Sequence, residues 1–191
     1  MQFDIQSQNG NLKLPQTSIF NEMNSDLLIC IRSWCGDDLQ QKVLNEIIRY
    51  LSATDADLEV TSPFEYVENL SSTANKVRVA FLMANEALYS ENKDHYKYGF
   101  EVAICYKKSN EICIASVGRF SFKYQKKSKM IQLYESAGFA DDLTLLPSQL
   151  LGIEKSIEIK ISSVSKTDLE TIEIKSFFDD ETYWTAHIKS F

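Results

Sequence analysis

The stretch that decides the fold runs from Phe100 to Tyr134 and reads FEVAICYKKSNEICIASVGRFSFKYQKKSKMIQLY. Its first half contains two short apolar runs, Phe100 to Tyr106 and Glu111 to Val117, on either side of the polar turn KKSN, which is the pattern of a β-hairpin. The second half, from Arg119 to Tyr134, repeats this pattern around the basic turn at residues 125–129. We therefore predict four successive antiparallel strands that form a meander.

Upstream of this stretch, the sequence predicts one buried strand and two helices. Asp26 to Arg32 reads DLLICIR, a short apolar run that is typical of a strand buried on both faces. Apolar residues then recur at helical spacing up to Leu51, after two acids, Asp37 and Asp38, at the position where negative charge favours a helix start. A long second helix is predicted from Ser62 to Ser90, because serine followed by proline suits a first turn and one apolar stripe follows.

The remaining segments complete a single domain over residues 1–191. Residues 1–25 are polar and have only a weak strand pattern, so we expect them to be irregular. Three more strands are predicted after residue 152: Ser156 to Ile161, Glu170 to Lys175 and Tyr183 to Ile188. No linker or internal repeat divides the chain. Two helices followed by antiparallel strands indicate an α+β fold, in which two sheets pack face to face and each is covered by helix.

Composition and charge exclude several classes of protein. The 191 residues are 44% hydrophobic and 25% charged, which is ordinary for a globular domain with a real core. The net charge of −7 argues against a nucleic-acid partner or an anionic membrane, since both usually bind basic surfaces. No apolar run reaches the length of a membrane span, and the first residues lack the features of a signal peptide. We therefore expect a cytoplasmic protein.

Cysteines and histidines do not form a recognisable metal site or catalytic site. No two of the four cysteines are spaced C-x-x-C, as a structural zinc site would require. Three of them stand inside apolar runs and are expected to be buried, reduced thiols; these are Cys30, Cys105 and Cys113. Cys35, beside Trp34, is the one expected near the surface. His95 and His187 have no nucleophile or acid in a recognisable frame, so we interpret both as structural.

Several short motifs occur in the same order as those of a known family. They are AFLMANEALY and YGFEVA at residues 80–89 and 98–103, ICIASVGRFSFKY at 112–124, LPSQLLG at 146–152 and DDET at 179–182. This series resembles the metal-dependent type-2C Ser/Thr protein phosphatases, whose corresponding motifs are Ala-Asn-x-x-Leu before a Gly-Thr-Thr strand, A-x-V-G-D-S-R-x-Y, Leu-x-x-x-Leu-Gly and D-(D/N)-x-T. The resemblance extends from Leu27 to the end of the chain. It implies an αββα sandwich of two antiparallel sheets flanked by helices.

The resemblance also implies a metal-dependent reaction, but the sequence departs from the family motifs at the positions of metal-binding aspartates. The family hydrolyses phosphoserine and phosphothreonine with two divalent metal ions held by aspartates. Its first strand runs into Asp-Gly-x-Gly-Gly, but here Arg32 stands where the bridging aspartate belongs. The family's Gly-Asp-Ser reads Gly118-Arg119-Phe120, so a second aspartate is replaced by arginine. A guanidinium group is always protonated and cannot bind a metal ion.

Asp179 is the one retained family-like position for a metal ligand. The family's later Ser-Asp-Gly metal segment has no counterpart, and the helices expected after Phe177 are absent from the sequence. One carboxylate cannot hold a two-metal centre. We therefore predict a catalytically inactive relative that binds no cofactor and serves as a binding or regulatory module for a protein partner.

Two other interpretations remain open at this point. The chain could be a divergent metal-dependent phosphatase or other hydrolase that holds magnesium or manganese in a rewired site. The acids available for such a site are Asp37, Asp38, Asp141, Asp142 and Asp179. Helix-start and solvated-loop roles explain these acids more simply. Alternatively, the resemblance could be accidental and the chain an unrelated α+β interaction protein.

Arginine and lysine residues supply the candidate contacts for a partner. If Arg32 and Arg119 lie together, they can hold an anionic group of a partner, or they can pair internally with Asp179 and stabilise the fold. Lysines gather at the expected hairpin turns: Lys107, Lys108, Lys123, Lys126, Lys127 and Lys129. We interpret them as solubilising, with a docking patch for an acidic or phosphorylated partner as the alternative.

Overall fold

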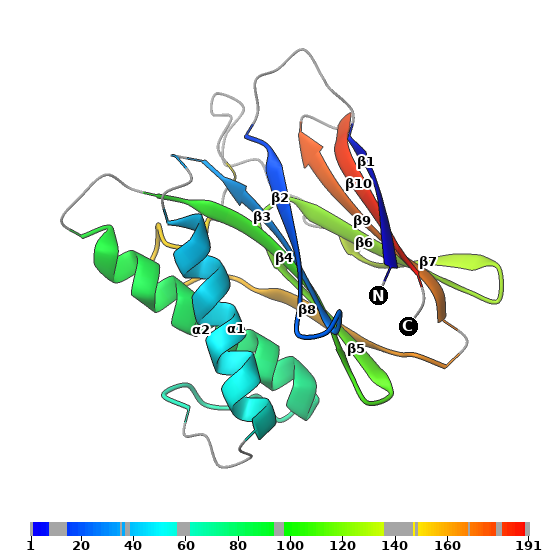
Figure 1. The fold of residues 1–191 in the computed structure, drawn as a ribbon, viewed down its shortest axis with the longest axis horizontal. Helices are drawn as coiled ribbons and strands as arrows, with labels where there is room; N and C mark the ends of the chain where they lie inside the picture. The colour runs from blue at the N-terminus through cyan, green and yellow to red at the C-terminus, as the bar shows by residue number, and fades with distance from the viewer. Residues whose placement is uncertain are drawn as a thin grey trace.

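Two five-stranded antiparallel sheets packed face to face form the framework of the protein (Figure 1). The computed structural model describes residues 2–7, 15–34, 36, 39–56, 62–93, 98–135, 147, 149–167, 169–178 and 181–189. Ten strands and two helices lie within these ranges. The predicted α+β fold with two antiparallel sheets is confirmed.

The first sheet is covered by both helices on one face and by the second sheet on the other. Its strands, in spatial order, are β2 (Thr17–Glu22), β3 (Leu27–Ser33), β4 (Phe100–Lys108), β5 (Glu111–Val117) and β8 (Lys160–Ser165). The helices are α1 (Gln40–Ala56) and α2 (Ser72–Glu91). Leu27, Ile29 and Ile31 pack towards the helices, whereas Leu28 and Cys30 pack towards the second sheet. Burial on both faces explains why β3 reads as a continuous apolar run.

The second sheet has one apolar face and one polar face. Its strands, in spatial order, are β1 (Gln2–Ser7), β10 (Glu181–Lys189), β9 (Leu169–Phe178), β6 (Phe120–Lys126) and β7 (Lys129–Glu135). The inward residues Phe122, Ile172 and Ile174 belong to the core between the sheets. On the outward side, Glu173 lies 3.1 Å from the Lys175 ammonium and 3.9 Å from the His187 ring. Both described helices cover the first sheet. The charged outer face of the second sheet therefore suits direct contact with water.

The four strands between Phe100 and Glu135 do not form the predicted meander. β4 pairs with β5 in the first sheet, and β6 pairs with β7 in the second. The chain crosses between the sheets at Gly118 and Arg119, where Gly118 adopts a φ of 102°. Both predicted hairpins are present, but they belong to different layers of the sandwich.

The second helix begins later than predicted. Ser71 is its N-cap and accepts a hydrogen bond from the Ala74 N–H, while Ser62 only closes a local turn with Phe64. The Asn75 side chain binds both the N–H and the C=O of Val67, at 2.8 and 2.9 Å. These hydrogen bonds satisfy the backbone of the preceding segment outside the helix, and such competition is a common reason for a helix to start late.

Residues 1–25, expected to be irregular, contribute an edge strand to each sheet. β1 pairs with β10 in the second sheet, and β2 pairs with β3 in the first. The pairing of β1 depends on a partner distant in sequence, which a local pattern cannot show. In the described part of the chain, no helix has the length and apolar character needed to cross a membrane.

Two of the family-like motifs contact each other. Asn85, on α2, is buried and accepts a hydrogen bond of 2.8 Å from the Gly152 N–H. Its amide group donates to the backbone oxygen of Glu154 at 2.9 Å. Gly152 has a φ of 93°, and a Cβ there would lie 3.0 Å from the Cβ of Leu88. The Ala-Asn motif and the Leu-Gly motif therefore form one joint between α2 and the segment before β8.

Candidate functional site

The candidate site lies between the two sheets at the end of β3 and the start of β4. Arg32 and Glu101 are directly opposite in the β3–β4 register, and both follow the alternation of residues that face the second sheet. Their side chains have no exposed surface. The Arg32 Nη1 atom lies 3.1 Å from Glu101 Oε2. The two residues form a wholly buried ion pair, which is rare unless both charges are compensated.

Both oxygens of the Glu101 carboxylate accept hydrogen bonds. Oε2 accepts from Arg32 and, at 2.9 Å, from the Trp34 indole N–H. Oε1 accepts from the backbone N–H of Arg119 at 2.7 Å and lies 3.5 Å from Arg119 Nε. We call Arg32, Trp34, Glu101 and Arg119 the Arg–Glu cluster. Its two guanidinium groups and one carboxylate carry a net charge of +1.

The crossing between the sheets places Arg119 against Glu101. A Cβ on Gly118 would lie 2.6 Å from Cγ of Glu101, so only glycine allows the backbone to approach this closely. The Arg119 guanidinium stacks on Trp34, with 5.4 Å between Cζ and the ring centroid. Burial lowers the pKa of Arg119, Glu101 opposes this effect and the charge of Arg32 reinforces it. Arginine stays protonated despite such a shift.

Arg32 also links the two sheets. Its Nη2 atom donates to the hydroxyl of Ser176 on β9, and to that of Thr17 on β2 at 3.4 Å. Ser176 is completely buried and belongs to the second sheet. One guanidinium group therefore joins β3 to strands of both sheets.

The structure brings together two of the residues singled out from the sequence and adds a third. Arg32 and Arg119 converge on one carboxylate. The carboxylate comes from Glu101, which sequence reasoning missed. The sequence did contain a sign of this buried carboxylate, because Glu101 is an acid on the same inward face of the strand as Ala103 and Cys105. Asp179 and the other candidate acids, Asp37, Asp38, Asp141 and Asp142, lie outside the described residues, as do Asp180, Cys35 and His95.

The Arg–Glu cluster does not fit the metal ions that the resemblance implies. Magnesium and manganese need several oxygen ligands, most of them negatively charged. The cluster offers one carboxylate, already saturated by Arg32, Trp34 and Arg119. Two fixed positive charges would also repel a divalent cation. Within the described ranges, no group of three or more histidine, cysteine, aspartate or glutamate residues is placed to bind a metal.

The described cysteines and His187 lie outside the Arg–Glu cluster. Cys30, Cys105 and Cys113 are buried, as predicted. Burial raises the pKa of Cys30 to about 12, so its thiol is not a nucleophile near neutral pH. His187 lies on the polar face of the second sheet, near Glu173.

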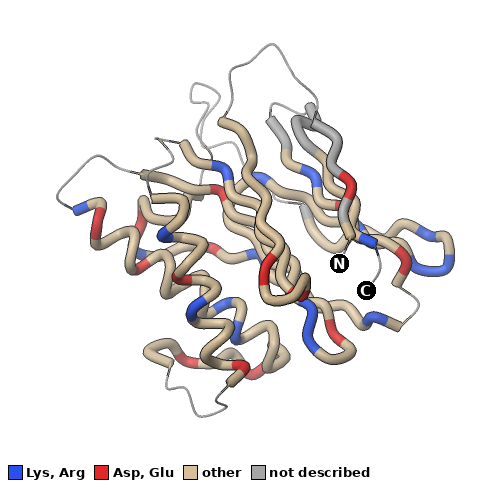
Figure 2. The backbone as a smooth tube through the Cα atoms, in the orientation of Figure 1, with Lys and Arg blue, Asp and Glu red and all other residues tan. Residues whose placement is uncertain are grey.

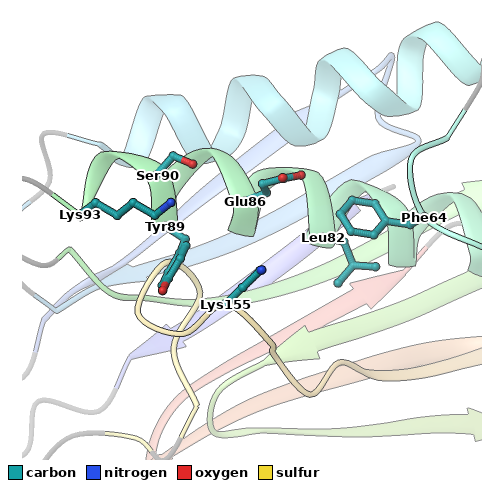
Figure 3. A pocket seen from close by; sticks show the side chains of 7 residues that line it. All are labelled: Phe64, Leu82, Glu86, Tyr89, Ser90, Lys93 and Lys155. Carbon is teal, nitrogen blue, oxygen red and sulfur yellow. The ribbon is translucent and has the colours of Figure 1, made fainter.

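A separate pocket of about 360 Å³ lies on the outer side of α2 (Figure 3). Phe64 and Leu82 line one end, and Tyr89 lies nearer the other end. Lys155 reaches into the space from the segment after Gly152. Lys93 lies over the Tyr89 ring, 5.5 Å from its centroid. The pocket shares no residue with the Arg–Glu cluster, and both apolar and charged side chains line it.

Comparison with known proteins identifies solved structures that have the same fold. No family model and no curated protein matches the sequence. Solved structures do match. PppA, described as a key regulatory component of T6SS in Pseudomonas aeruginosa, is 10% identical with a TM-score of 0.65, and the match covers 100% of this chain and 97% of that one. Serine/threonine phosphatase Stp1 from Staphylococcus aureus is 14% identical with a TM-score of 0.59, over 91% and 75% of the two chains.

A third similar structure contains metal. The catalytic domain of the serine/threonine protein phosphatase PstP, in complex with two manganese ions, is 15% identical with a TM-score of 0.59, over 93% of this chain and 77% of that one. Together these matches define the class: the chain has the fold of the type-2C serine/threonine phosphatases. At such low identity, the likeness concerns the fold and not the activity.

Proposed function

We propose that this chain is a catalytically inactive domain with the type-2C phosphatase fold, which acts in the cytoplasm by binding a protein partner and regulating it. The observation that carries the proposal is the buried ion pair of Arg32 and Glu101. The sequence resemblance assigns Arg32 to the position of the family's bridging metal aspartate, and in the structure a carboxylate of the same chain pairs with this cation. The resemblance assigns Arg119 to a second aspartate position, and this cation lies 3.5 Å from the same carboxylate.

The cluster favours a structural role for the two arginines over direct contact with a partner. Arg32 is fully buried and Arg119 is 4% exposed, so neither guanidinium offers a broad surface to another molecule. Removing such a pair from water is costly, and it persists when hydrogen bonds compensate each charge. Both arginines pair with Glu101, whereas Asp179, the internal partner expected from the sequence, lies outside the described residues. A regulatory role agrees with the description of PppA as a regulatory component, although that description belongs to PppA.

Metal binding and phosphate-ester hydrolysis test the proposal together. The purified chain is mixed with millimolar manganese, its melting temperature is measured, and hydrolysis of p-nitrophenyl phosphate is followed. We expect no hydrolysis above the metal-free rate and no rise in melting temperature, because an ion that binds only the folded state would raise it by mass action.

The competing interpretation, a divergent phosphatase with a rewired site, predicts the opposite. A rise of several degrees that disappears when Asp179→Asn is combined with Asp180→Asn would show a metal site and overturn the proposal. The matched control combines Asp141→Asn with Asp142→Asn, which removes the same charge from another acidic pair. Loss of the response in both double variants would place the metal in a site built from several segments, and the proposal would fail in that case too.

A further inference from the structure

One edge of the second sheet has the properties of a docking site. In the described part of the chain, β6 is the only strand that pairs with β7. Lys126 pairs with Lys129 across a two-residue turn, so the hydrogen-bonding of an antiparallel ladder turns the N–H and C=O of Met130 away from β6. An edge strand of this kind presents backbone groups to which another strand can bind.

The same edge carries exposed apolar side chains. Met130 is 50% exposed and Ile131 is 39% exposed. They are consecutive residues of a strand, so they lie on opposite faces of the sheet. Tyr66 and Val67 are the other large hydrophobic residues with comparable exposure in the described part of the chain, and they lie in the segment before α2. A strand added to β7 would therefore meet an apolar side chain on each face.

A group of lysines lies at one end of this edge, in a chain whose net charge is −7. Lys126, Lys127 and Lys129 lie at the tip of the β6–β7 hairpin, and Figure 2 shows this tip as a basic segment. Lys123 lies further along β6. The turn residues Lys127 and Ser128 have φ values of 48° and 60°, as a type I′ turn requires. Positive charge is thus concentrated at one end of an edge strand.

We propose that β7 binds an extended, acidic segment of a partner protein, which adds to the second sheet as a further strand. Backbone hydrogen bonds to the edge give affinity, Met130 and Ile131 contact alternate side chains of the segment, and the lysines select acidic residues near the turn. A second copy of this chain fits less well because its own β7 edge carries the same lysines, whereas an acidic segment offers the opposite charge. Lysines at an edge also prevent aggregation, and that role alone predicts no bound peptide.

A fluorescence anisotropy titration tests the charge requirement. The probe is a fluorescein-labelled peptide of alternating glutamate and valine, added to the full chain at low salt. We expect binding that weakens about tenfold when Lys127→Glu is combined with Lys129→Glu. The matched control combines Lys93→Glu with Lys155→Glu, which makes the same charge change beside α2, and should leave the affinity unchanged. No binding by the unmutated chain, or equal loss in both variants, would overturn the proposal.

Strand pairing needs its own test, because a flexible acidic peptide could bind lysines without adding to the sheet. Met130→Pro removes a backbone donor that faces away from β6, so it should abolish binding while leaving the β6–β7 hairpin intact. Hydrogen exchange should show slower exchange of the β7 amides in the presence of the peptide. A peptide of the same charge interrupted by prolines should not bind. Equal binding of the interrupted peptide, or unchanged exchange along β7, would overturn the proposal.

This inference names a partner for the binding role proposed above, but its test is independent of the metal experiment. Failure of the peptide to bind would leave the manganese result untouched, and hydrolysis of a phosphate ester would leave the β7 result untouched. If sedimentation shows dimers that Met130→Pro dissociates, the occupant is a second copy, and the proposal of an acidic partner is wrong.

Discussion

Arg32 and Glu101 form an ion pair in which Nη1 and Oε2 are 3.1 Å apart and neither side chain has any exposed surface. The pair lies between two sheets and is held by Trp34, Ser176 and the Arg119 backbone. Removal of one member would leave the other buried charge without its direct counter-charge, which is among the most destabilising changes that a single substitution can make.

Arg32→Met should lower the free energy of unfolding by about 3–5 kcal/mol, because Glu101 is then buried without its main counter-charge. Urea unfolding measures the change. The control is Arg49→Met, which breaks an exposed pair with Glu46 on α1 and should cost less than about 1 kcal/mol. Equal effects of the two substitutions would show that the buried pair does not stabilise the fold.

Arg119→Met should cost less than Arg32→Met, about 1–2 kcal/mol, because the backbone N–H of residue 119 continues to bind Glu101. The β7 peptide titration, repeated on both variants at a temperature where they are folded, should give the same affinity as the unmutated chain. Lost peptide binding with unchanged stability would instead assign the arginines to partner recognition.

Gly118→Ala should destabilise the protein by more than about 2 kcal/mol, since it combines a positive φ with a Cβ only 2.6 Å from Glu101. Gly36→Ala is the matched control. Its φ is 107°, and its Cβ would lie 3.6 Å from the nearest atom of Tyr98, so it should show the cost of the backbone conformation alone, about 1 kcal/mol. The difference in melting temperature between the two variants measures the effect of the close approach of residue 118 to Glu101. Equal melting temperatures would contradict this effect.

Asn85→Ala should cost about 2 kcal/mol because the Gly152 N–H loses its acceptor in a buried position. Gln41→Ala removes an exposed side-chain hydrogen bond to Asn45 on α1 and serves as the control, with a change within about 0.5 kcal/mol. Hydrogen exchange at Gly152 should accelerate in Asn85→Ala alone. Unchanged exchange there would mean that the joint is held by packing.

Asp55 should make stability depend on acid pH. Burial raises the pKa of this carboxyl, but hydrogen bonds from Lys108 and Tyr106 outweigh that effect and hold it below its usual value. A depressed pKa stabilises the folded state above the unfolded pKa of about 3.9, and this contribution is lost as the pH falls through the folded pKa. Asp55→Asn should therefore flatten the loss of stability between about pH 5 and pH 2. Parallel curves for the two proteins would contradict the assignment.

Local patterns in the sequence predicted the elements better than their arrangement. The apolar run of β3 and the turns after Lys108 and Lys126 were sufficient to find β3 and the two hairpins, because burial and turn geometry act over a few residues. The strand predicted at 156–161 was placed too early, since β8 is Lys160–Ser165. The crossing at Gly118 was not visible, since a hairpin looks the same in either sheet. The start of α2 was misplaced because Asn75 binds backbone groups of the segment that ends at Ser71.

Local patterns predicted only part of the candidate site, because its contacts join residues that are distant in the sequence. The family resemblance directed attention to Arg32 and Arg119, but their shared partner depends on the β3–β4 register, which pairs Arg32 with Glu101. An acid on the inward face of a strand, two residues before Ala103, is the feature that should direct attention to such a partner. Contacts with Ser176 depend on the packing of the two sheets, and no local pattern encodes it.

The division of strands between the two sheets sets an order in which the protein can be completed during synthesis. Every strand of the first sheet precedes residue 166, whereas the second sheet requires β9 and β10, and β1 gains its neighbour only with β10. Once Ser165 has left the ribosome, the chain can complete its helix-covered sheet, while the other face of that sheet, with Leu28, Cys30 and Ile114, gains β9 and β10 only later. We expect this nascent intermediate to be the stage at which chaperones bind and aggregation begins.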